Sequence, residues 1–481
     1  MRRKYAKTLV PAALLLAAVM LQSCGLIKIN HPAPAAETKT ADGTTLSDMT
    51  TPVEEVIDYP AKQDAFFAAL PDVNYGGADF IVMSSVGGLL FDDGTTVFSA
   101  AVTERNRTVA EKYGVKIAEL EVSRDTMLSE LLASVASSSY YADLLLLPVD
   151  KVGTFALGGG LMNLRGVPFL DVSCEYFSPS SVSASTYSGR TYAAAGPASL
   201  ERDDVACLYY NKGIAAKLGT GDLYELVKKG EWTWDRFFEI MRLYDGCGEL
   251  EDGSASLLSV DPFAGVIADV VFHSSCETYL GAKDGGFALS DGLSAGSKLL
   301  DYARMFNTAG LKYTGNDAAS DFAGGAVAFM LDTLGTSASL ANSPNDWGIL
   351  PVPSESGRHG TYIAPDKAAL FAIPKGTADA EKSGVIMSAL NASSFGVLDY
   401  AYVRHALDRV LRDGDSANMM DMIISSVVYD PASALAPAVP AVNSAVFGIS
   451  YRWANGYDVP EWEITSALSE CADALDDLGG R

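Results

Sequence analysis

The sequence predicts an α/β protein of at least two domains that contains a parallel sheet. Short apolar runs alternate with amphipathic stretches along residues 80–147. The chain has 481 residues, 48% of them hydrophobic, which is more than one hydrophobic core usually serves. Strands that alternate with helices form parallel sheets with right-handed crossovers, and ligands of such sheets bind beyond the carboxyl ends of the strands.

The first elements follow a strand, helix, strand order. Residues 80–83 and 115–117 are predicted to be strands, and helical spacing over residues 102–113 predicts a helix between them. A second amphipathic helix over residues 125–137 precedes residues 144–147, which are four leucines. A strand that is apolar on both faces fits the interior of a parallel sheet.

The remainder of the chain predicts further helices and strands. One helix begins after Thr233, a residue type that caps helices, and has Asp235 in its first turn. Helices are expected over residues 213–218, 222–229, 233–244 and 294–307, strands over 326–331, 347–350 and 368–373, and a helical region from residue 380.

The N-terminal residues predict a lipoprotein signal. Basic residues precede an apolar run from Leu9, and residues 21–25 read LQSCG, a lipobox. Residues 1–23 would be removed, and Cys24 would carry a lipid that holds the protein to the cell membrane on its extracytoplasmic side. The alternative is an ordinary secretory leader with an incidental cysteine. Residues 24–60, rich in Ala, Pro and Thr, are expected to form a flexible stalk.

The net charge and the residue composition limit the classes of partner and cofactor that fit the chain. A formal net charge of −25 argues against nucleic acid as a partner and favours a neutral or cationic ligand. Four histidines without an HExxH motif, and cysteines without a CxxC pair, predict neither a metal nor a cofactor. Beyond Cys24, either disulfides or buried free thiols fit the five remaining cysteines: Cys174, Cys207, Cys247, Cys276 and Cys471.

Several motifs of the middle region occur together and in order. Residues 208–212 read LYYNK and residues 223–235 read LYELVKKGEWTWD, and weaker motifs follow at 325–330 (GAVAFM), 347–353 (WGILPVP) and 371–375 (FAIPK). This set resembles the bacterial extracellular solute-binding proteins of family 1, the lipoprotein receptors of carbohydrate-type ABC importers.

The resemblance implies a two-lobed, periplasmic-binding-protein-like fold of type II, in which a hinge joins two discontinuous α/β lobes. Lobe 1 is expected over residues 61–200 and 365–430, and lobe 2 over residues 201–364 and 431–481. The chain would cross between the lobes near residues 196–208, again after residue 353, and a third time at residues 429–431.

The resemblance also implies that the solute is held at the carboxyl ends of lobe strands and by the crossing segments. The expected ligand-binding residues at such positions are Ser85, Asp150, Asp204, Asp332, Thr333 and Trp453. A carboxylate can accept hydrogen bonds from two adjacent sugar hydroxyls, although each acid could equally be a solvated loop residue. Leu147 and Leu334 stand where family members often have an aromatic residue, so strong ring stacking is not expected there.

Other readings of single motifs are weaker. The spacing of Trp232, Trp234 and Trp347 favours packing in the core over stacking on a sugar. Residues 292–296 match the GxSxG pattern of hydrolases, but Ser294 is better explained as a helix N-cap. Residues 413–418 carry alternating oxygen ligands without the full spacing of a calcium loop, and a turn is expected there.

The expected function is therefore non-catalytic. A monomeric, lipid-anchored receptor would capture a small solute, most simply a sugar or oligosaccharide, and deliver it to the permease of an ABC transporter. The alternative is a structural or adhesive surface lipoprotein that binds protein or polymer partners. The sequence identifies neither the solute nor the permease, because a few side chains set specificity on one common fold.

Overall fold

The computed structural model divides the chain into two units, Met1–Ala69 and Leu70–Arg481. It describes residues 58–86, 90, 96–245, 256–260, 267–275, 277–283, 286–293, 298, 301–302, 318–325, 327–355, 362–363, 368–449, 452 and 457–479. The described part of the first unit is helix α2 (Tyr59–Ala68), which Asp58 caps by accepting a hydrogen bond from the amide of Ala61. The predicted signal, Cys24 and the stalk up to residue 57 lie outside the described residues.

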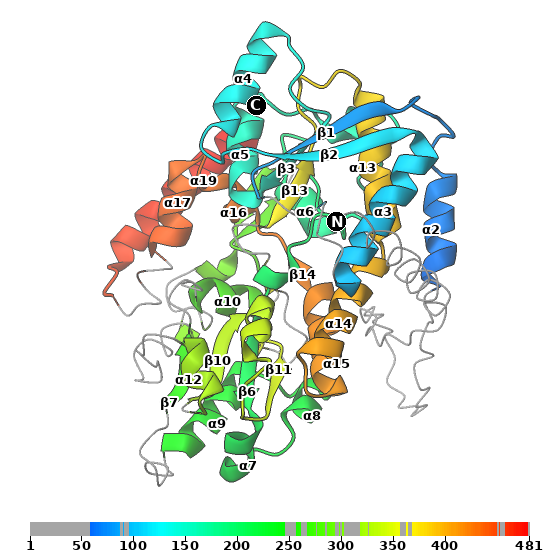
Figure 1. Cartoon of the computed structure of the whole chain (residues 1–481). Helices are drawn as coiled ribbons and strands as arrows, with labels where there is room; N and C mark the ends of the chain where they lie inside the picture. Colours follow the sequence, from blue (N-terminus) through cyan, green and yellow to red (C-terminus); the bar gives the residue numbers. More distant parts are fainter. Residues whose placement is uncertain are drawn as a thin grey trace, which may run out of the picture. The chain divides into compact units, whose positions relative to one another are not determined.

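The second unit contains a four-stranded sheet whose core is parallel (Figure 1). Its strand order is β13-β3-β1-β2, with β1 parallel to both β2 and β3 and with β13 antiparallel to β3. The elements are β1 (Ala78–Ser84), α3 (Val97–Tyr113), β2 (Val115–Glu121), α4 (Met127–Ser137), β3 (Leu144–Pro148) and β13 (Ala369–Ala372). The alternation predicted for residues 80–147 is confirmed, and every residue of β3 is buried.

Helix α3 begins and ends at residues that suit its termini. Thr96 accepts a hydrogen bond from the amide of Ser99 at the N-terminus, and Gly114 follows the helix with φ of +59°. A Cβ atom on Gly114 would lie 2.3 Å from the side-chain oxygen of Asn74, so both the backbone conformation and the space require glycine there.

A second sheet of four strands is mixed and has the order β11-β6-β10-β7. Strand β6 lies antiparallel to β10 and to β11, whereas β10 is parallel to β7. The strands are β6 (Ala206–Asn211), β7 (Ser256–Val260), β10 (Val327–Thr333) and β11 (Trp347–Leu350). They confirm the strands predicted at residues 326–331 and 347–350.

Helices of the middle region also match the prediction. They are α7 (Lys212–Leu218), α8 (Leu223–Lys228) and α9 (Trp234–Asp245). Thr233 caps α9, because its hydroxyl accepts a hydrogen bond from the amide of Arg236. The helix predicted over residues 294–307 lies almost entirely outside the described residues.

Two segments that connect the sheets pair with each other. Strand β12 (Tyr362–Ile363) lies between β11 and β13 in the sequence, and β14 (Val427–Val428) follows helix α15 (Gly414–Ser425). The two short strands form a parallel pair in which Tyr362 lies opposite Val427. Strand β13 of the first sheet follows β12 in the chain, so the first sheet is assembled from segments that lie far apart in the sequence.

Two of the C-terminal helices pack on different parts of the second unit. The hydroxyl of Ser416 in α15 accepts a hydrogen bond from the amide of Ile349 in β11, so α15 packs on the second sheet (Figure 1). Helix α16 (Pro431–Leu435) packs on α5 (Val149–Leu157), close enough that a Cβ atom on Gly153 would lie 2.3 Å from the carbonyl oxygen of Ala434. We therefore propose that α15 belongs with lobe 2 and α16 with lobe 1.

The other elements are short or lie toward the C-terminus. The further α-helices and strands are α6 (Pro179–Ala184), β4 (Thr186–Tyr187), β5 (Arg190–Thr191), α10 (Ile267–Ser274), β8 (Leu280–Lys283), β9 (Gly286–Leu289), α12 (Ala318–Ala323), α13 (Ala380–Ser394), α14 (Val397–Arg409), α17 (Pro440–Asn443) and α19 (Glu461–Gly479). The 3-10 helices are η2 (Leu164–Gly166), η3 (Arg202–Asp204), η4 (Asp291–Leu293) and η5 (Leu334–Leu340), and η6 (Ser444–Ile449) is a π-helix. Within the described part of the chain, none of the helices combines the length and the apolar character that crossing a bilayer requires.

Candidate functional site

Ser84 and Ser85 lie where strand β1 of the first sheet ends. Because β1 and β3 are parallel, their carboxyl ends meet at the same edge, and Ser84 lies opposite Leu146. The amide of Ser85 donates a hydrogen bond to the carbonyl oxygen of Leu146 at 3.3 Å, which holds Ser85 beside β3. Ser84 is buried, whereas Ser85 is only partly buried, so the hydroxyl of Ser85 lies nearer the surface of this edge.

Asp150 belongs to the same edge and forms an ion pair. It is in the first turn of α5, directly after β3, and its carboxylate lies 2.5 Å from the guanidinium of Arg124, which follows β2. Both side chains stay partly exposed, at 36% for Arg124 and 21% for Asp150. A guanidinium donates hydrogen bonds and a carboxylate accepts them, so the pair presents both functions side by side. Sequence reasoning missed Arg124, which lies three residues beyond the end of β2.

Three of the other predicted residues are brought together by the second sheet. Asp332 and Thr333 end β10 and lie opposite Cys207 and Ala206 at the start of β6. Asp204 precedes this strand in η3. The pairing of β10 with β6 therefore places Asp204 beside Asp332 and Thr333 in the fold, although 128 positions separate Asp204 from Asp332 in the sequence.

The backbone around Thr333 is fixed by Tyr209. The phenol of Tyr209 donates to the carbonyl oxygens of Thr333 and Leu334, at 2.8 and 3.1 Å. Burial raises the pKa of Tyr209 well above its ordinary value, so the phenol keeps its proton and remains a donor. Asp332 is 7% exposed and one of its carboxylate oxygens accepts a hydrogen bond from the amide of Thr333. The end of β10 is thus a rigid support for polar side chains.

The segment that precedes β6 is tied to helix α14 by two contacts that sequence reasoning missed. Arg202 pairs with Asp399, and Asp203 accepts a hydrogen bond of 2.5 Å from the phenol of Tyr402. Asp399 and Tyr402 are one helical turn apart, so the two contacts use one face of α14. No local pattern could have indicated these pairs, because the partners lie almost two hundred residues apart.

Three tryptophans that the sequence predicts to be core residues lie in the described part of the chain. Trp232, Trp234 and Trp347 are at most 3% exposed, which confirms their prediction as core residues. The indole of Trp232 donates to the carbonyl oxygen of Pro351 and that of Trp234 to the hydroxyl of Ser274. Trp453, the aromatic candidate for the ligand site, and Ser294 of the GxSxG pattern lie outside the described residues.

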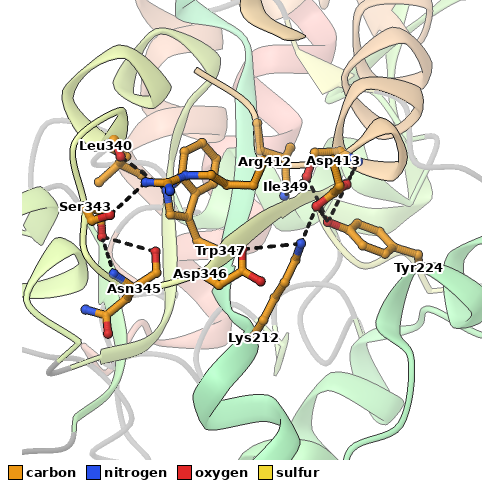
Figure 2. A network of polar contacts seen from close by, with 11 residues as sticks. Lys212, Tyr224, Leu340, Ser343, Asn345, Asp346, Trp347, Ile349, Arg412 and Asp413 are labelled. Carbon is orange, nitrogen blue, oxygen red and sulfur yellow. Dashed lines mark hydrogen bonds and ion pairs between the residues drawn. The ribbon is translucent and has the colours of Figure 1, made fainter. Parts of the chain in front are cut away.

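Asp413 starts a helix and does not belong to a cation-binding loop. It caps α15 by accepting a hydrogen bond from the amide of Ser416 at 2.6 Å. Its carboxylate also pairs with the ammonium of Lys212 and accepts hydrogen bonds from the phenol of Tyr224 (Figure 2). In the same network the guanidinium of Arg412 donates to the carbonyl oxygen of Ser343 (Figure 2). These contacts hold the start of α15 against the second sheet.

The described part of the chain offers few candidates for a reactive cysteine or a metal site. Cys174, Cys207 and Cys471 carry free thiols, and Cys247 and Cys276 are not described. Cys207 and Cys471 are buried, which supports the buried-thiol alternative for these two, whereas Cys174 is only partly buried. Burial raises the pKa of Cys207 well above its ordinary value, so this thiol is unreactive. Within the residues that the structure describes, no group of three or more His, Cys, Asp or Glu side chains could hold a metal ion.

Comparison with known proteins gives a family and a fold. The family model described as bacterial extracellular solute-binding protein matches residues 106–402, well over half of the chain. A search of curated protein sequences finds no match.

Solved structures of sugar-binding proteins resemble the chain over most of its length. The sugar-binding protein MalE from Xanthomonas citri matches with a TM-score of 0.56 and 14% identity, covering 83% of this chain and 98% of that one. The cyclic alpha-maltosyl-1,6-maltose binding protein from Arthrobacter globiformis matches with a TM-score of 0.54 and 16% identity, over 84% and 100% of the two chains. A family 1 extracellular solute-binding protein from Bifidobacterium longum subsp. infantis gives the same values. At such identities the likeness establishes the fold, which confirms the periplasmic-binding-protein-like architecture.

Proposed function

Because the chain belongs to the bacterial extracellular solute-binding proteins, we propose that it captures a sugar or oligosaccharide and delivers it to an ABC transporter. Family membership places its work outside the cytoplasm and makes it a binding protein. The proposal adds the class of solute, the permease as the partner, and the absence of a catalytic step.

The observation that supports the proposal is that polar side chains lie together at strand ends in each of the two sheets. Asp150 with Arg124 provides an acceptor and a donor at the first sheet, and Asp332 with Thr333 and Asp204 provides acceptors at the second. Hydroxyl groups of a sugar both donate and accept hydrogen bonds, so such a mixed set suits them. We propose these five residues and Ser85 as solute contacts, and Trp453 as an aromatic contact beside them.

The ion pair of Asp150 narrows the class of ligand. With Arg124 at 2.5 Å, the negative charge of this carboxylate is already balanced, so a cationic ligand gains little from it. A neutral polyol uses the donor and the acceptor together. The similar solved structures include proteins that bind cycloalternan, maltotetraose and acarbose, which supports an oligosaccharide as the solute.

The proposed action is a shift between open and closed conformations. A solute that contacts residues of both sheets binds the closed form more tightly than the open form, and therefore increases its population. The permease would recognise that closed form. We further propose that the protein is a monomer held to the membrane through a lipid on Cys24.

A thermal-shift screen of the chain without residues 1–24 tests the solute class. The panel contains mono- and oligosaccharides, polyols, amino acids, peptides and metal ions. A ligand present at one hundred times its Kd adds about 2.7 kcal/mol to the free energy of unfolding, which raises Tm measurably. A shift with a sugar supports the proposal. Shifts with amino acids or peptides alone would contradict the sugar assignment, and silence across the panel would favour a surface lipoprotein that binds polymers.

Calorimetric titration of variants then tests the site. Asp150→Ala and Asp332→Asn are expected to weaken binding of the sugar identified in the screen by tenfold or more. Asp79→Asn is the matched control, because Asp79 lies at the opposite end of β1 and is exposed. Equal affinity in all three variants would show that the solute binds elsewhere.

A further inference from the structure

Asp204 is the last residue of the turn η3 and is partly buried. Within the described part of the chain, its carboxylate forms neither a hydrogen bond nor an ion pair. The two residues before it are engaged with helix α14, because Arg202 pairs with Asp399 and Asp203 accepts a hydrogen bond from the same helix. The turn therefore holds Asp204 in place through its neighbours and leaves the carboxylate of Asp204 able to accept hydrogen bonds from a solute.

Tyr402 of α14 holds the turn through the side chain of Asp203. Its phenol donates to a carboxylate oxygen of Asp203 at 2.5 Å. The ring of Tyr402 meets the ring of Phe98 of α3 edge to face, with 5.8 Å between the centroids, which fixes the direction of the phenol. Burial of the ring and the carboxylate of Asp203 raise the pKa of Tyr402 well above its ordinary value, so the phenol keeps its proton and remains a donor.

The helix η5 holds the same turn through its backbone. The amide of Leu334 donates to the carbonyl oxygen of Val205, the residue after the turn, at 2.8 Å. A Cβ atom on Gly335 would lie 2.9 Å from the Cβ atom of Asp203 and 3.0 Å from its carbonyl oxygen. Glycine at this position therefore lets η5 approach the turn closely. Since η5 follows directly after β10, the contact also sets how the turn lies against the end of β10.

Both contacts act on Asp203, the neighbour of Asp204 in the chain. We propose that Tyr402 and Gly335 are positioning residues for solute binding, which keep the carboxylate of Asp204 at the end of β10 before the solute arrives. The inference rests on the proposed function, in which Asp204 contacts the solute beside Asp332. An acceptor that is held in advance loses less freedom when the solute binds, so loss of either contact weakens binding although neither residue touches the solute.

Hydrogen exchange of the protein without solute tests the positioning by itself. The peptide that covers residues 201–205 of the full chain is followed by mass spectrometry. Tyr402→Phe removes only the hydroxyl, and we expect exchange in this peptide to become about threefold to tenfold faster, the effect of one lost hydrogen bond. Tyr400→Phe is the matched control on the same helix, because the hydroxyl of Tyr400 forms no hydrogen bond with any residue that the structure describes. Exchange at the wild-type rate in Tyr402→Phe would overturn the proposal.

A double-mutant cycle tests the link to the solute. The probe is the sugar that raises Tm most in the thermal-shift screen, and calorimetry gives its Kd for wild type, Tyr402→Phe, Asp204→Ala and the double variant. We expect Tyr402→Phe to weaken binding about threefold to tenfold when Asp204 is present and not at all in Asp204→Ala, because Tyr402 acts through Asp204. Equal losses in both backgrounds, or unchanged binding in Asp204→Ala, would contradict the proposal. If no sugar binds the wild type, the proposed function fails, while hydrogen exchange still decides whether Tyr402 holds the turn.

Gly335→Ala tests the contact with η5. The added Cβ atom is expected to displace Asp203, to speed exchange in the same peptide and to weaken binding of the sugar about tenfold. Gly166→Ala is the matched control, since Gly166 also belongs to a 3-10 helix and a Cβ atom there meets no atom within 4 Å. Wild-type exchange and affinity in Gly335→Ala would remove Gly335 from the proposal. Should this variant not fold, Tyr402→Phe, which lacks a single oxygen atom, still decides the role of the turn.

Discussion

The guanidinium of Arg202 is paired with the carboxylate of Asp399 at 2.6 Å, with 3% of the arginine side chain exposed. Two further contacts of Arg202 go to the carbonyl oxygens of Leu200 and Pro197, at 3.1 and 3.0 Å. The ring of Phe98 lies 5.6 Å from the guanidinium. The segment that leads into β6 is therefore fixed by a buried cation whose neighbours come from α3 and α14.

Removal of this cation is expected to be costly. Arg202→Ala leaves two carbonyl groups and the Asp399 carboxylate without their donor, and we expect the free energy of unfolding to fall by about 3–5 kcal/mol. The control is Arg107→Ala, because Arg107 is 47% exposed on α3 and pairs with Glu104 and Glu111 of the same helix. That variant should lose less than about 1 kcal/mol. Urea unfolding measures both, and equal losses would contradict a structural role for Arg202.

Substitutions of two tryptophans, Trp234 and Trp462, are also expected to differ sharply in their effect on the free energy of unfolding. Trp234→Ala removes a ring that is 1% exposed and leaves the hydroxyl of Ser274 without its donor, so we expect a loss of about 3–5 kcal/mol. Trp462 on α19 is 72% exposed, and Trp462→Ala should change stability by less than about 0.5 kcal/mol. A chemical unfolding curve for each variant decides the matter. A small loss for Trp234→Ala would mean that the core around α9 collapses into the space.

Local signals explain why so much of the fold could be predicted. The stop of α3 at Gly114, the cap of α9 at Thr233 and the four leucines of β3 each act within a few residues of the element that they define. The packing of α15 on β11 has no such signal. It depends on Asp413 reaching Lys212, a contact between residues 201 positions apart.

The candidate site was predictable only in part, for the same reason. Asp332 and Thr333 could be placed at a strand end, since the apolar run before them is visible in the sequence. Arg124 lies seven residues beyond the strand predicted over residues 115–117, too far for that predicted strand end to indicate it. The pairs of Arg202 with Asp399 and of Asp203 with Tyr402 could not be predicted, because the partners lie almost two hundred residues apart.

Gly348 in β11 allows a test of close packing. A Cβ atom there would lie 2.1 Å from the phenol oxygen of Tyr224 and 2.6 Å from the ring of Tyr210. Gly348→Ala is therefore expected to cost about 1–3 kcal/mol. Gly414→Ala is the matched control, since a Cβ atom at the start of α15 meets no atom within 4 Å, and alanine favours a helix. Thermal unfolding compares the two, and a Gly348→Ala protein as stable as Gly414→Ala would refute the close contact.

The acid range offers a prediction about Asp413. Burial acts to raise the pKa of this carboxyl group, but the ammonium of Lys212 and the amide of Ser416 outweigh it and hold the pKa below the ordinary value of 3.8. As the pH falls, the unfolded chain therefore takes up this proton before the folded chain does. The stabilisation from Asp413 is complete above the ordinary pKa and is lost as the pH falls through the lowered pKa of the folded state.

Asparagine at this position separates charge from capping. Asp413→Asn keeps a side-chain oxygen that can cap α15, yet it removes the titrating group and the ion pair with Lys212. We expect the variant to be less stable than wild type at pH 7 and to approach wild-type stability as the pH falls toward 3, because wild type loses its ionic contact there. Asp415→Asn is the control, since Asp415 is 44% exposed and pairs with Lys228 at the surface, so its stability should follow wild type across this range. Urea unfolding at a series of pH values measures the difference. A constant gap between wild type and Asp413→Asn from pH 7 to pH 3 would show that the network around α15 stabilises the fold through its hydrogen bonds alone.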